Sequence, residues 1–352
     1  MPTTNIRGNI RGNGRGNGRG TRWGIVATGT IAHSFARDLA LVPGAELAAV
    51  ASRSVDRAAA FADEFGGARA YGSAEDLAAD PDLDVVYVAS PHALHLAHAR
   101  PALEAGKAVL CEKALTLNLA DAETMVGLAR KHGVFLMEAM WMACNPVVRA
   151  LREGLAAGRF GEPRQLHADL GFVVDRPADD RLLDPALGGG ALLDMGIYPL
   201  TFAHLMLGEA EALTATAVLS PAGVDLDVAI AGRYPGGAVA ALTSTMTSTS
   251  PRTATIATTT GLLEIPAPFH HPPYVVYTPT DGRPQRIDGA EPVIGSGLGT
   301  EAVEVQRCLA AGLTESPLVP HAQTLALMRQ LDDLRAQIGV VYPGEDAPAA
   351  AT

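Results

Sequence analysis

The chain has 352 residues, of which 48% are hydrophobic and 18% are charged, a balance typical of packed globular proteins and not of disordered ones. The net charge is −11, and the first 20 residues contribute arginines but no acid, so the remainder is more acidic still. Such an acidic body does not favour nucleic-acid binding. No apolar run reaches the roughly 18 residues of a membrane span, and three widely spaced cysteines fit neither a disulfide framework nor a zinc site. We therefore expect a cytoplasmic protein without a membrane or nucleic-acid partner.

Both ends of the chain differ in composition from the rest. Residues 1–20 repeat Arg-Gly-Asn and offer almost no apolar surface to bury, so we expect a disordered tail. Residues 340–352 are rich in alanine and proline and are expected to form a flexible tail. Between the two tails we expect two domains, 21–143 and 144–339, because the pattern of apolar residues changes near residue 144.

The first expected domain alternates short apolar runs with amphipathic stretches. Runs that are apolar throughout indicate strands buried on both faces, and strands alternating with helices indicate a doubly wound parallel sheet of the α/β class. The predicted strands are Trp23–Thr28, Leu47–Ser52, Val85–Ser90, Ala108–Cys111 and Val134–Glu138, and the predicted helices are Ile31–Leu41, Asp56–Phe65, Leu94–Glu104 and Leu119–His132.

The second expected domain has a different pattern. Residues 212–280 are rich in short β-type runs separated by turns that contain glycine and proline, which predicts an open, mostly antiparallel sheet within an α+β domain. A break at three glycines, 188–190, precedes another helix. The remaining predicted elements are a helix from Pro146, strands Arg164–Phe172, Ala238–Ser248 and Thr253–Ile265, and closing helices Glu301–Ala311 and Ala322–Ile338.

The turn after the first strand has the context of a dinucleotide site, where a pyrophosphate meets backbone amides and the positive end of a helix. Ala27 stands in place of the first glycine of G-x-G-x-x-A, while Gly29 permits close approach of the backbone. The motif alone is also compatible with a tight turn between strand and helix that binds no dinucleotide. The residues expected to contact the cofactor here are Ala27, Thr28, Gly29, Thr30 and Ile31.

The end of the second strand distinguishes the two nicotinamide dinucleotides. An acid there pairs with the ribose 2′-hydroxyl, whereas an arginine accommodates a 2′-phosphate. The residues present are Ser52, Arg53 and Ser54, so NADP is favoured over NAD. The alternative is that Arg53 is solvated, or stacks on adenine without contacting phosphate.

Further polar residues follow two later strands, at the carboxyl ends where open α/β sheets bind ligands. Ser90, His92 and His95 follow one strand, and Glu112 and Lys113 follow the next. His92, His95 and His98 are not expected to bind a metal, because they would spread over about 120° of a helix and no acid or cysteine joins them. We expect His98 to be structural and His270 and His271 to lie in a loop.

A third group of candidate residues lies far downstream. Asp194 and Tyr198 are four residues apart and share one face of a helix if that helix is regular. With Lys113 they make a lysine, an aspartate and a tyrosine that can meet at one site. Each also has a structural interpretation: Tyr198 as a packing residue, Lys113 as a surface lysine and Asp194 as a cap.

Together these motifs resemble the glucose–fructose oxidoreductase and inositol dehydrogenase (Gfo/Idh/MocA) family, and within it the branch of dimeric dihydrodiol dehydrogenases and NADP-dependent D-xylose dehydrogenases. The stretches that carry the resemblance are Arg22–Val26, Val109–Lys113, Phe135–Trp141 and Gly189–Tyr198. The resemblance implies a Rossmann domain, NADP(H), a homodimer or higher homo-oligomer, and His92 and His95 on the nicotinamide side.

The activity implied by the resemblance is hydride transfer between the nicotinamide and a hydroxyl-bearing carbon of a cyclic polyol, aldose or trans-dihydrodiol. Tyr198 would exchange the alcohol proton, and Lys113, expected within about 6 Å of its hydroxyl, would lower its pKa. Asp194 is the third expected catalytic residue. Two alternatives remain open: a ketoreductase acting on a keto-sugar or glycoside, and a cofactor-sensing regulatory protein without turnover.

Two departures from the family pattern leave the substrate open. Ala114 replaces the proline of the family's Glu-Lys-Pro, and an arginine common just after the tryptophan is absent after Trp141. Because no proline follows Lys113, the trans form of the Lys113–Ala114 peptide is favoured.

Overall fold

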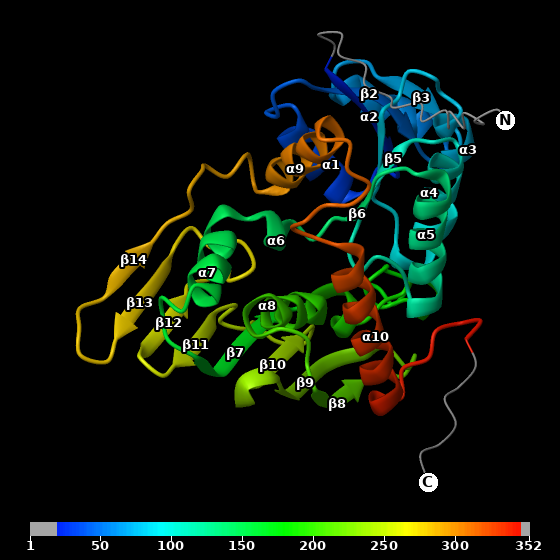
Figure 1. The fold of residues 1–352 in the computed structure, drawn as a ribbon. Coiled ribbons are helices and arrows are strands. Elements are labelled where there is room, and N and C mark those ends of the chain that lie inside the picture. Colours follow the sequence, from blue (N-terminus) through cyan, green and yellow to red (C-terminus); the bar gives the residue numbers. More distant parts are fainter. Residues whose placement is uncertain (1–19, 346–352) are drawn as a thin grey trace, which may run out of the picture.

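The structure is a computed structural model, and it describes residues 20–345. The predicted tails therefore lie outside the described residues, except for Gly20 and residues 340–345. Figure 1 shows two sheets, each with its own helices. In the last part of the chain, α9 packs on α1 and α6, and α10 packs on α5 and β8, so each of the two helices contacts both parts of the molecule. The α/β class with a second, mostly antiparallel sheet is confirmed.

The first sheet is parallel and has six strands in the order β3-β2-β1-β4-β5-β6, the order of a dinucleotide-binding Rossmann fold. Strands β4, β5 and β6 are buried throughout and β1 and β2 over their last four residues, as the continuous apolar runs predict, whereas the edge strand β3 is only partly buried. The elements are β1 Thr21–Val26, α1 Thr30–Leu39, β2 Ala45–Ala51, α2 Val55–Glu64, β3 Arg69–Tyr71, α3 Ala74–Ala78, β4 Val85–Val88, η1 His92–Leu94, α4 His95–Glu104, β5 Ala108–Cys111, α5 Leu119–His132 and β6 Leu136–Glu138.

The second sheet has eight strands in the order β14-β13-β12-β11-β7-β10-β9-β8. Only β7 and β10 pair in parallel; the other described pairs in this sheet are antiparallel. The elements are α6 Trp141–Cys144, α7 Pro146–Ala156, β7 Pro163–Gly171, η2 Pro185–Leu187, η3 Leu192–Gly196, α8 Ile197–Leu207, β8 Ala212–Leu219, β9 Asp225–Arg233, η4 Pro235–Gly237, β10 Val239–Thr245, β11 Ala254–Thr258, β12 Gly261–Ile265, β13 Val275–Pro279, β14 Gln285–Ile287, α9 Leu298–Ala310 and α10 His321–Ile338.

Capping residues fix where several helices begin and end. The side chain of Asn118 accepts a hydrogen bond from the backbone N of Asp121 at 2.9 Å, and α5 ends at Gly133 in the left-handed conformation (φ 64°). Asn145 caps α7 in the same way, with Pro146 at the first helical position. The start and end of α5 and the start of α7 therefore follow directly from these residues.

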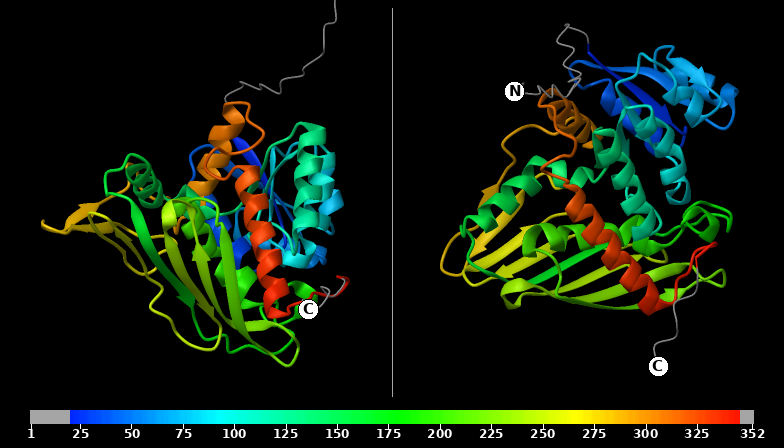
Figure 2. Two further views of the ribbon diagram at one scale, coloured as in Figure 1. Left: turned by 60° about the horizontal axis from the view of Figure 1, so that its bottom comes forward. Right: turned by 45° about the vertical axis from the view of Figure 1, so that its right-hand side comes forward.

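Helices α7, α8 and α10 cover one face of the eight-stranded sheet, and no described helix covers the other (Figure 2). In the described part of the chain, residues 185–207 are long and apolar enough to cross a membrane, yet 78% of their most apolar window is buried inside the structure. This segment, which ends with α8, is therefore a core element packed between the sheet and its neighbouring helices.

Three expectations about the fold are wrong in detail. The edge strand β3 and the short helix α3 were not predicted, because each is too short for a clear periodicity. The run Thr253–Ile265 forms two strands, β11 and β12, that pair as a hairpin. Residues 340–345 are not a flexible tail: Tyr342 is buried and its hydroxyl donates to the carbonyl of Gly189 at 2.9 Å.

Candidate active site

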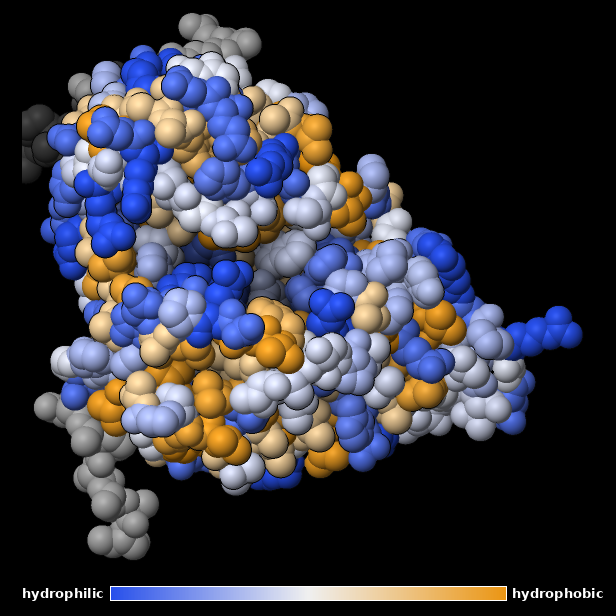
Figure 3. All heavy atoms as spheres, turned by 180° about the vertical axis from the view of Figure 1, so that it is seen from behind, coloured by the Kyte–Doolittle hydropathy of each residue, from blue (hydrophilic) through white to orange (hydrophobic). Residues whose placement is uncertain are grey.

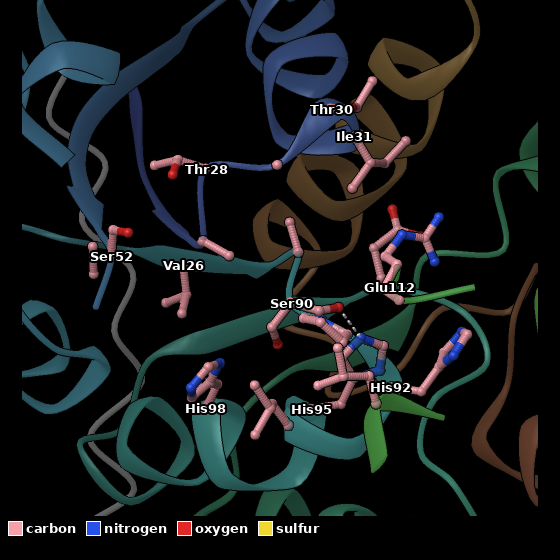
Figure 4. A pocket seen from close by; sticks show the side chains of 18 of the residues that line it. Val26, Thr28, Thr30, Ile31, Ser52, Ser90, His92, His95, His98 and Glu112 are labelled. Carbon is pink, nitrogen blue, oxygen red and sulfur yellow. Dashed lines mark hydrogen bonds between the residues drawn. The ribbon is translucent and has the colours of Figure 1, made fainter. Parts of the chain in front are cut away.

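A cavity of about 1150 Å³ opens at the carboxyl ends of β1, β2, β4 and β5 and extends to α8. It is lined by every residue expected from the sequence to bind the cofactor, and also by Asp194 and Tyr198. Figure 3 shows the molecule hollowed between its two parts, with hydrophilic residues at the rim. In Figure 4, Ser52 and Glu112 stand on opposite sides of this cavity, which therefore has two distinct ends.

The first turn, at one wall of the cavity, leads from β1 into α1. Ala27 has a positive φ of 79°, the conformation for which glycine is the usual residue, so the turn keeps its shape without the first glycine. Gly29 is the N-cap of α1, and no side chain caps this helix. The first amides of α1 therefore remain available to an anion at the positive end of the helix, whereas the backbone N of Ala27 already donates to the carbonyl oxygen of Ala51.

The end of the cavity near Ser52 contains two arginines. Arg53 and Arg57 both line it, and neither guanidinium has a hydrogen-bond or ion-pair partner among residues 20–345. Ser54 instead caps α2 by accepting a hydrogen bond from the backbone N of Arg57. Arg57 was missed in the sequence, although its place four residues after Arg53, in the first turn of a helix, was a usable signal.

His92 and His95 line the opposite part of the cavity and are buried. Burial lowers the pKa of His92 to about 4 and that of His95 to about 3. The Nε2 atom of His92 is 3.1 Å from the carbonyl oxygen of Lys113, and Nδ1 of His95 is 3.1 Å from that of Ala114. The two rings therefore pack directly against the backbone that carries Lys113, while their other nitrogens face the carbonyl oxygens of Gly188 and Ser90. His98, expected to be structural, also lines the cavity.

The peptide bond between Lys113 and Ala114 is cis, so the expectation of a trans bond is wrong. The contacts of the surrounding turn show how it is held without proline. Besides the two histidines, Glu112 accepts from the backbone N of Lys113 at 3.3 Å, and Glu138 accepts from the backbone N of Leu115 at 3.1 Å. Buried side chains thus bind the polar backbone groups on both sides of the bond.

Lys113 points into the cavity, with only 11% of its side chain exposed. Its ammonium donates a hydrogen bond to the carbonyl oxygen of Asp194 at 2.7 Å and lies 3.6 Å from that residue's carboxylate. It also lies over the ring of Tyr198, 4.9 Å from the ring centre. The expected distance of about 6 Å to the Tyr198 hydroxyl itself stays a prediction.

Asp194 is held as a carboxylate. Burial alone would raise its pKa, but Lys113 and then Arg181, whose guanidinium lies 3.0 Å from Oδ1, hold the pKa well below its usual range. Arg181 was not among the predicted residues. Asp194 also does not belong to a regular helix, because residues 192–196 form a π-helical turn.

Tyr198 is almost fully buried and accepts a hydrogen bond from the indole N of Trp141 at 2.7 Å. The expectation of a lowered pKa is wrong for this structure: burial, followed by the negative charge of Glu112, raises the pKa of the phenol well above 10. The proximity of Lys113 does not outweigh these two effects.

The loop that carries His270 and His271 packs against the same tyrosine and tryptophan. The ring of His270 is 4.8 Å from that of Tyr198, and the ring of His271 stacks on Trp141 at 4.7 Å. Their position in a loop agrees with the sequence, but their place beside the candidate catalytic residues was missed. No local pattern could indicate it, because Trp141 and this loop are more than 120 residues apart.

The described residues contain no group of three or more His, Cys, Asp or Glu side chains that could hold a metal ion. The cavity itself brings together a lysine, a carboxylate and a phenol with the turn expected to bind a dinucleotide.

Comparisons with known proteins match both parts of the chain. Residues 21–140 match an oxidoreductase family with an NAD-binding Rossmann fold, and residues 148–264 match the GFO/IDH/MocA C-terminal domain. The chain belongs to the Gfo/Idh/MocA oxidoreductase family. Its similarity to the dihydrodiol dehydrogenase branch is also confirmed. Trans-1,2-dihydrobenzene-1,2-diol dehydrogenase of Mus musculus is 39% identical over 328 residues, covering 92% of this chain and 98% of that protein.

Two further similar proteins agree with this assignment. The corresponding dehydrogenase of Xenopus tropicalis is 35% identical, covering 92% of this chain and 99% of that protein. A solved 3-ketoreductase from Actinomadura kijaniata, in complex with NADP and TDP-benzene, has a TM-score of 0.80 at 27% identity, covering 91% of this chain and 98% of that chain. The protein is thus a dehydrogenase with an NAD(P)-binding Rossmann domain that acts on CH–OH groups.

Proposed function

We propose that the protein is an NADP(H)-dependent oxidoreductase that transfers hydride between the nicotinamide and a hydroxyl-bearing carbon of a cyclic polyol, aldose or trans-dihydrodiol. The observation that carries the proposal is that Lys113, Asp194 and Tyr198 line the same cavity as the dinucleotide turn. The similarity to the trans-1,2-dihydrobenzene-1,2-diol dehydrogenases supports this substrate class.

The residues present fit NADP. The uncapped N-terminus of α1 suits a pyrophosphate, and the guanidinium groups of Arg53 and Arg57 suit the 2′-phosphate. Glu112 stands opposite Ser52 in Figure 4, and Lys113 is the next residue in the chain, with its ammonium over the ring of Tyr198. The reactive end of the cofactor therefore belongs at this end of the cavity. When bound, the cofactor supplies the hydride chemistry.

The protein's own residues supply the proton chemistry and the geometry. Tyr198, which is neutral because burial and Glu112 raise its pKa, donates its proton to the carbonyl oxygen during reduction. The phenolate that this step leaves is the form that takes up the alcohol proton in the reverse, oxidative direction. The Lys113 ammonium lies in the cavity over the ring of Tyr198. From there it orients and polarises the substrate oxygen that Tyr198 protonates. Asp194, kept ionised by Lys113 and Arg181, positions the ammonium and does not itself exchange a proton with the substrate.

The preference for NADP is expected to depend on the two arginines. Replacing Arg53 with alanine removes a charge-assisted contact worth about 1.5–3 kcal/mol, so the preference over NAD should fall roughly ten- to a hundred-fold. Titration of both dinucleotides by fluorescence measures the ratio of dissociation constants. Arg152→Ala, which changes an arginine that does not line the cavity, is the control. An unchanged ratio in both Arg53→Ala and Arg57→Ala would contradict the assignment.

Assembly of at least a homodimer is expected through the uncovered face of the eight-stranded sheet. Small and apolar side chains, including Ala229, Ala231, Val239 and Ala241, point to this exposed face. A flat face of this kind can bury more than about 1,000 Å² against its twin. Light scattering at micromolar concentration should give at least twice the mass of one chain. The Ala241→Arg substitution should reduce this measured mass. A monomeric wild type refutes the expectation.

A ketoreductase acting on a keto-sugar or glycoside is the second candidate, because a solved 3-ketoreductase is similar to 91% of this chain. It would use the same lysine and tyrosine. The two candidates differ in kcat/KM: the dehydrogenase favours small diols and aldoses, whereas the ketoreductase favours larger keto-sugars.

A further inference from the structure

Trp141 lines the cavity, but the proposed mechanism gives it no role. It is the first residue of the short helix α6, and its indole Nε1 donates a hydrogen bond to the hydroxyl oxygen of Tyr198 at 2.7 Å. An indole N–H can only donate, so the direction of this hydrogen bond is fixed and the phenol oxygen is the acceptor. The bond therefore acts on the same oxygen that carries the proton to be transferred.

The direction of this hydrogen bond determines what the phenol can do with its own proton. A phenol has one proton to donate and lone pairs with which to accept. Because Trp141 occupies an acceptor position of the Tyr198 oxygen, the proton of Tyr198 is not used in this contact. No group among residues 20–345 accepts it, and Tyr198 lines the cavity. The proton is therefore available to a ligand in the cavity.

Two segments that are remote in the chain pack against the indole ring. His271 stacks on it, with the ring centres 4.7 Å apart and the planes inclined by 28°. The turn before α9 also approaches it closely, because a Cβ at Gly297 would lie 2.7 Å from a ring carbon of Trp141. Glycine, which lacks a Cβ, permits this approach. These contacts hold the indole N–H in place against Tyr198.

The charged surroundings of the phenol oppose its ionisation, and the indole favours it. Burial, then the negative charge of Glu112, raises the pKa of Tyr198, and the strongest influence that lowers it is the hydrogen bond from Trp141. A donor stabilises the phenolate more than the phenol, because a hydrogen bond to an ion is roughly twice as strong. The charged and titratable groups around the phenol and the indole are Glu112, Lys113, Asp194, His270, His271 and Glu301.

We propose that Trp141 is a positioning residue, whose indole N–H directs the Tyr198 hydroxyl toward the substrate oxygen and stabilises the phenolate that proton transfer leaves. This inference rests on the proposed function, since Trp141 acts through the proton transfer of Tyr198. During reduction the O–H bond of Tyr198 breaks, its proton passes to the substrate oxygen as the carbonyl carbon takes up the hydride, and the electron pair stays on the phenolate oxygen. Trp141 keeps its own proton throughout.

The first experiment observes the hydrogen bond without cofactor or substrate. The chain has two tryptophans, and the indole N–H of the other, Trp23, is buried without a partner in the described part of the chain. In proton–nitrogen NMR spectra, Trp23→Phe therefore identifies the indole signal of Trp141 by elimination. Adding Tyr198→Phe should move this signal upfield, because the N–H loses its acceptor. A signal that does not move overturns the proposal.

The second experiment measures kcat of alcohol oxidation against pH in the wild type, Trp141→Phe and Trp23→Phe. Phenylalanine keeps an aromatic ring but cannot donate, so the rise of kcat with pH should move about 1–2 pH units higher. At neutral pH, kcat should fall roughly three- to ten-fold in both reaction directions, while the affinities for NADP⁺ and NADPH stay within a few-fold. Trp23→Phe is the matched control, since it loses an N–H without a partner, and it should keep the wild-type profile. A wild-type profile in Trp141→Phe overturns the positioning role.

The two experiments separate failure of this inference from failure of the proposed function. If the protein turns over no alcohol with NADP(H), the proposed function is wrong, while the NMR comparison still decides whether Trp141 donates to Tyr198. If Trp141→Phe does not fold, a fluorinated tryptophan is incorporated into the Trp23→Phe protein, where Trp141 is the only indole. Fluorine makes the N–H a stronger donor, so the rise of kcat should move to lower pH. A profile that stays in place overturns the positioning role.

Discussion

Replacing Tyr198 with phenylalanine is expected to lower kcat by about 10²–10⁴-fold, the usual contribution of a positioned general acid–base, or roughly 3–5 kcal/mol of barrier. The ring that packs between Lys113 and His270 remains, so the cavity should keep its shape. Only the hydroxyl is lost, together with its hydrogen bond from Trp141. Cofactor affinity should therefore stay within a few-fold of the wild type.

The measurement is kcat by NADPH absorbance, together with a fluorescence titration of the cofactor. Tyr277→Phe is a matched control, since it removes another hydrogen-bonded hydroxyl, at Thr260, from a buried tyrosine outside the cavity. It should leave kcat unchanged. Turnover by Tyr198→Phe close to that of the wild type would move the proton-transfer role to another residue, with His92, which also lines the cavity, the next candidate.

Replacing Lys113 with methionine should reduce kcat at least as strongly. The substitution removes the only ammonium that lines the cavity among the described residues, and it leaves the Asp194 carboxylate with Arg181 as its remaining cationic partner. Because an ion pair with little exposure is broken, a lower melting temperature is also expected.

A second lysine separates the loss of catalysis from the loss of stability. Lys107 is buried, donates to the carbonyl of Leu83 at 3.1 Å and does not line the cavity. Lys107→Met should therefore lower the melting temperature but keep kcat. If Lys113→Met retains turnover while cofactor and substrate still bind, the assigned mechanism is wrong.

The parallel sheet was predictable from sequence because its central strands are buried on both faces and because helices α2 and α5 begin at side-chain caps. Helix α5 lies where Leu119–His132 predicted it, between Asn118 and Gly133. The errors occur where local signals are weak: β3 has three residues, and the Thr259-Thr260 turn that divides β11 from β12 contains neither proline nor glycine. Residues 340–345 look like a tail in composition, yet Tyr342 finds a partner 153 residues away.

The site was predictable where a residue's role follows from its place at a strand end. The sequence identified Arg53, Glu112 and Lys113 in this way, and all three line one cavity. It could not indicate the burial that raises the pKa of Tyr198, because that depends on packing between α8 and distant segments.

Other features of the site depend on residues that are remote in the chain. The cis bond between Lys113 and Ala114 is surrounded by side chains from several elements. The expectation of a trans bond considered only the missing proline and not these contacts. Likewise, Ser296 and Leu298 line the cavity because α9 returns to pack on α1.

The most direct test of the account is an NADPH-linked absorbance assay of the wild-type protein over a panel of trans-dihydrodiols, aldoses, cyclic polyols and keto-sugars. The account predicts turnover with NADP(H) on at least one dihydrodiol, aldose or polyol, lost in both Tyr198→Phe and Lys113→Met. Tight NADPH binding without turnover on any member of the panel would contradict it and would favour a cofactor-sensing regulatory protein.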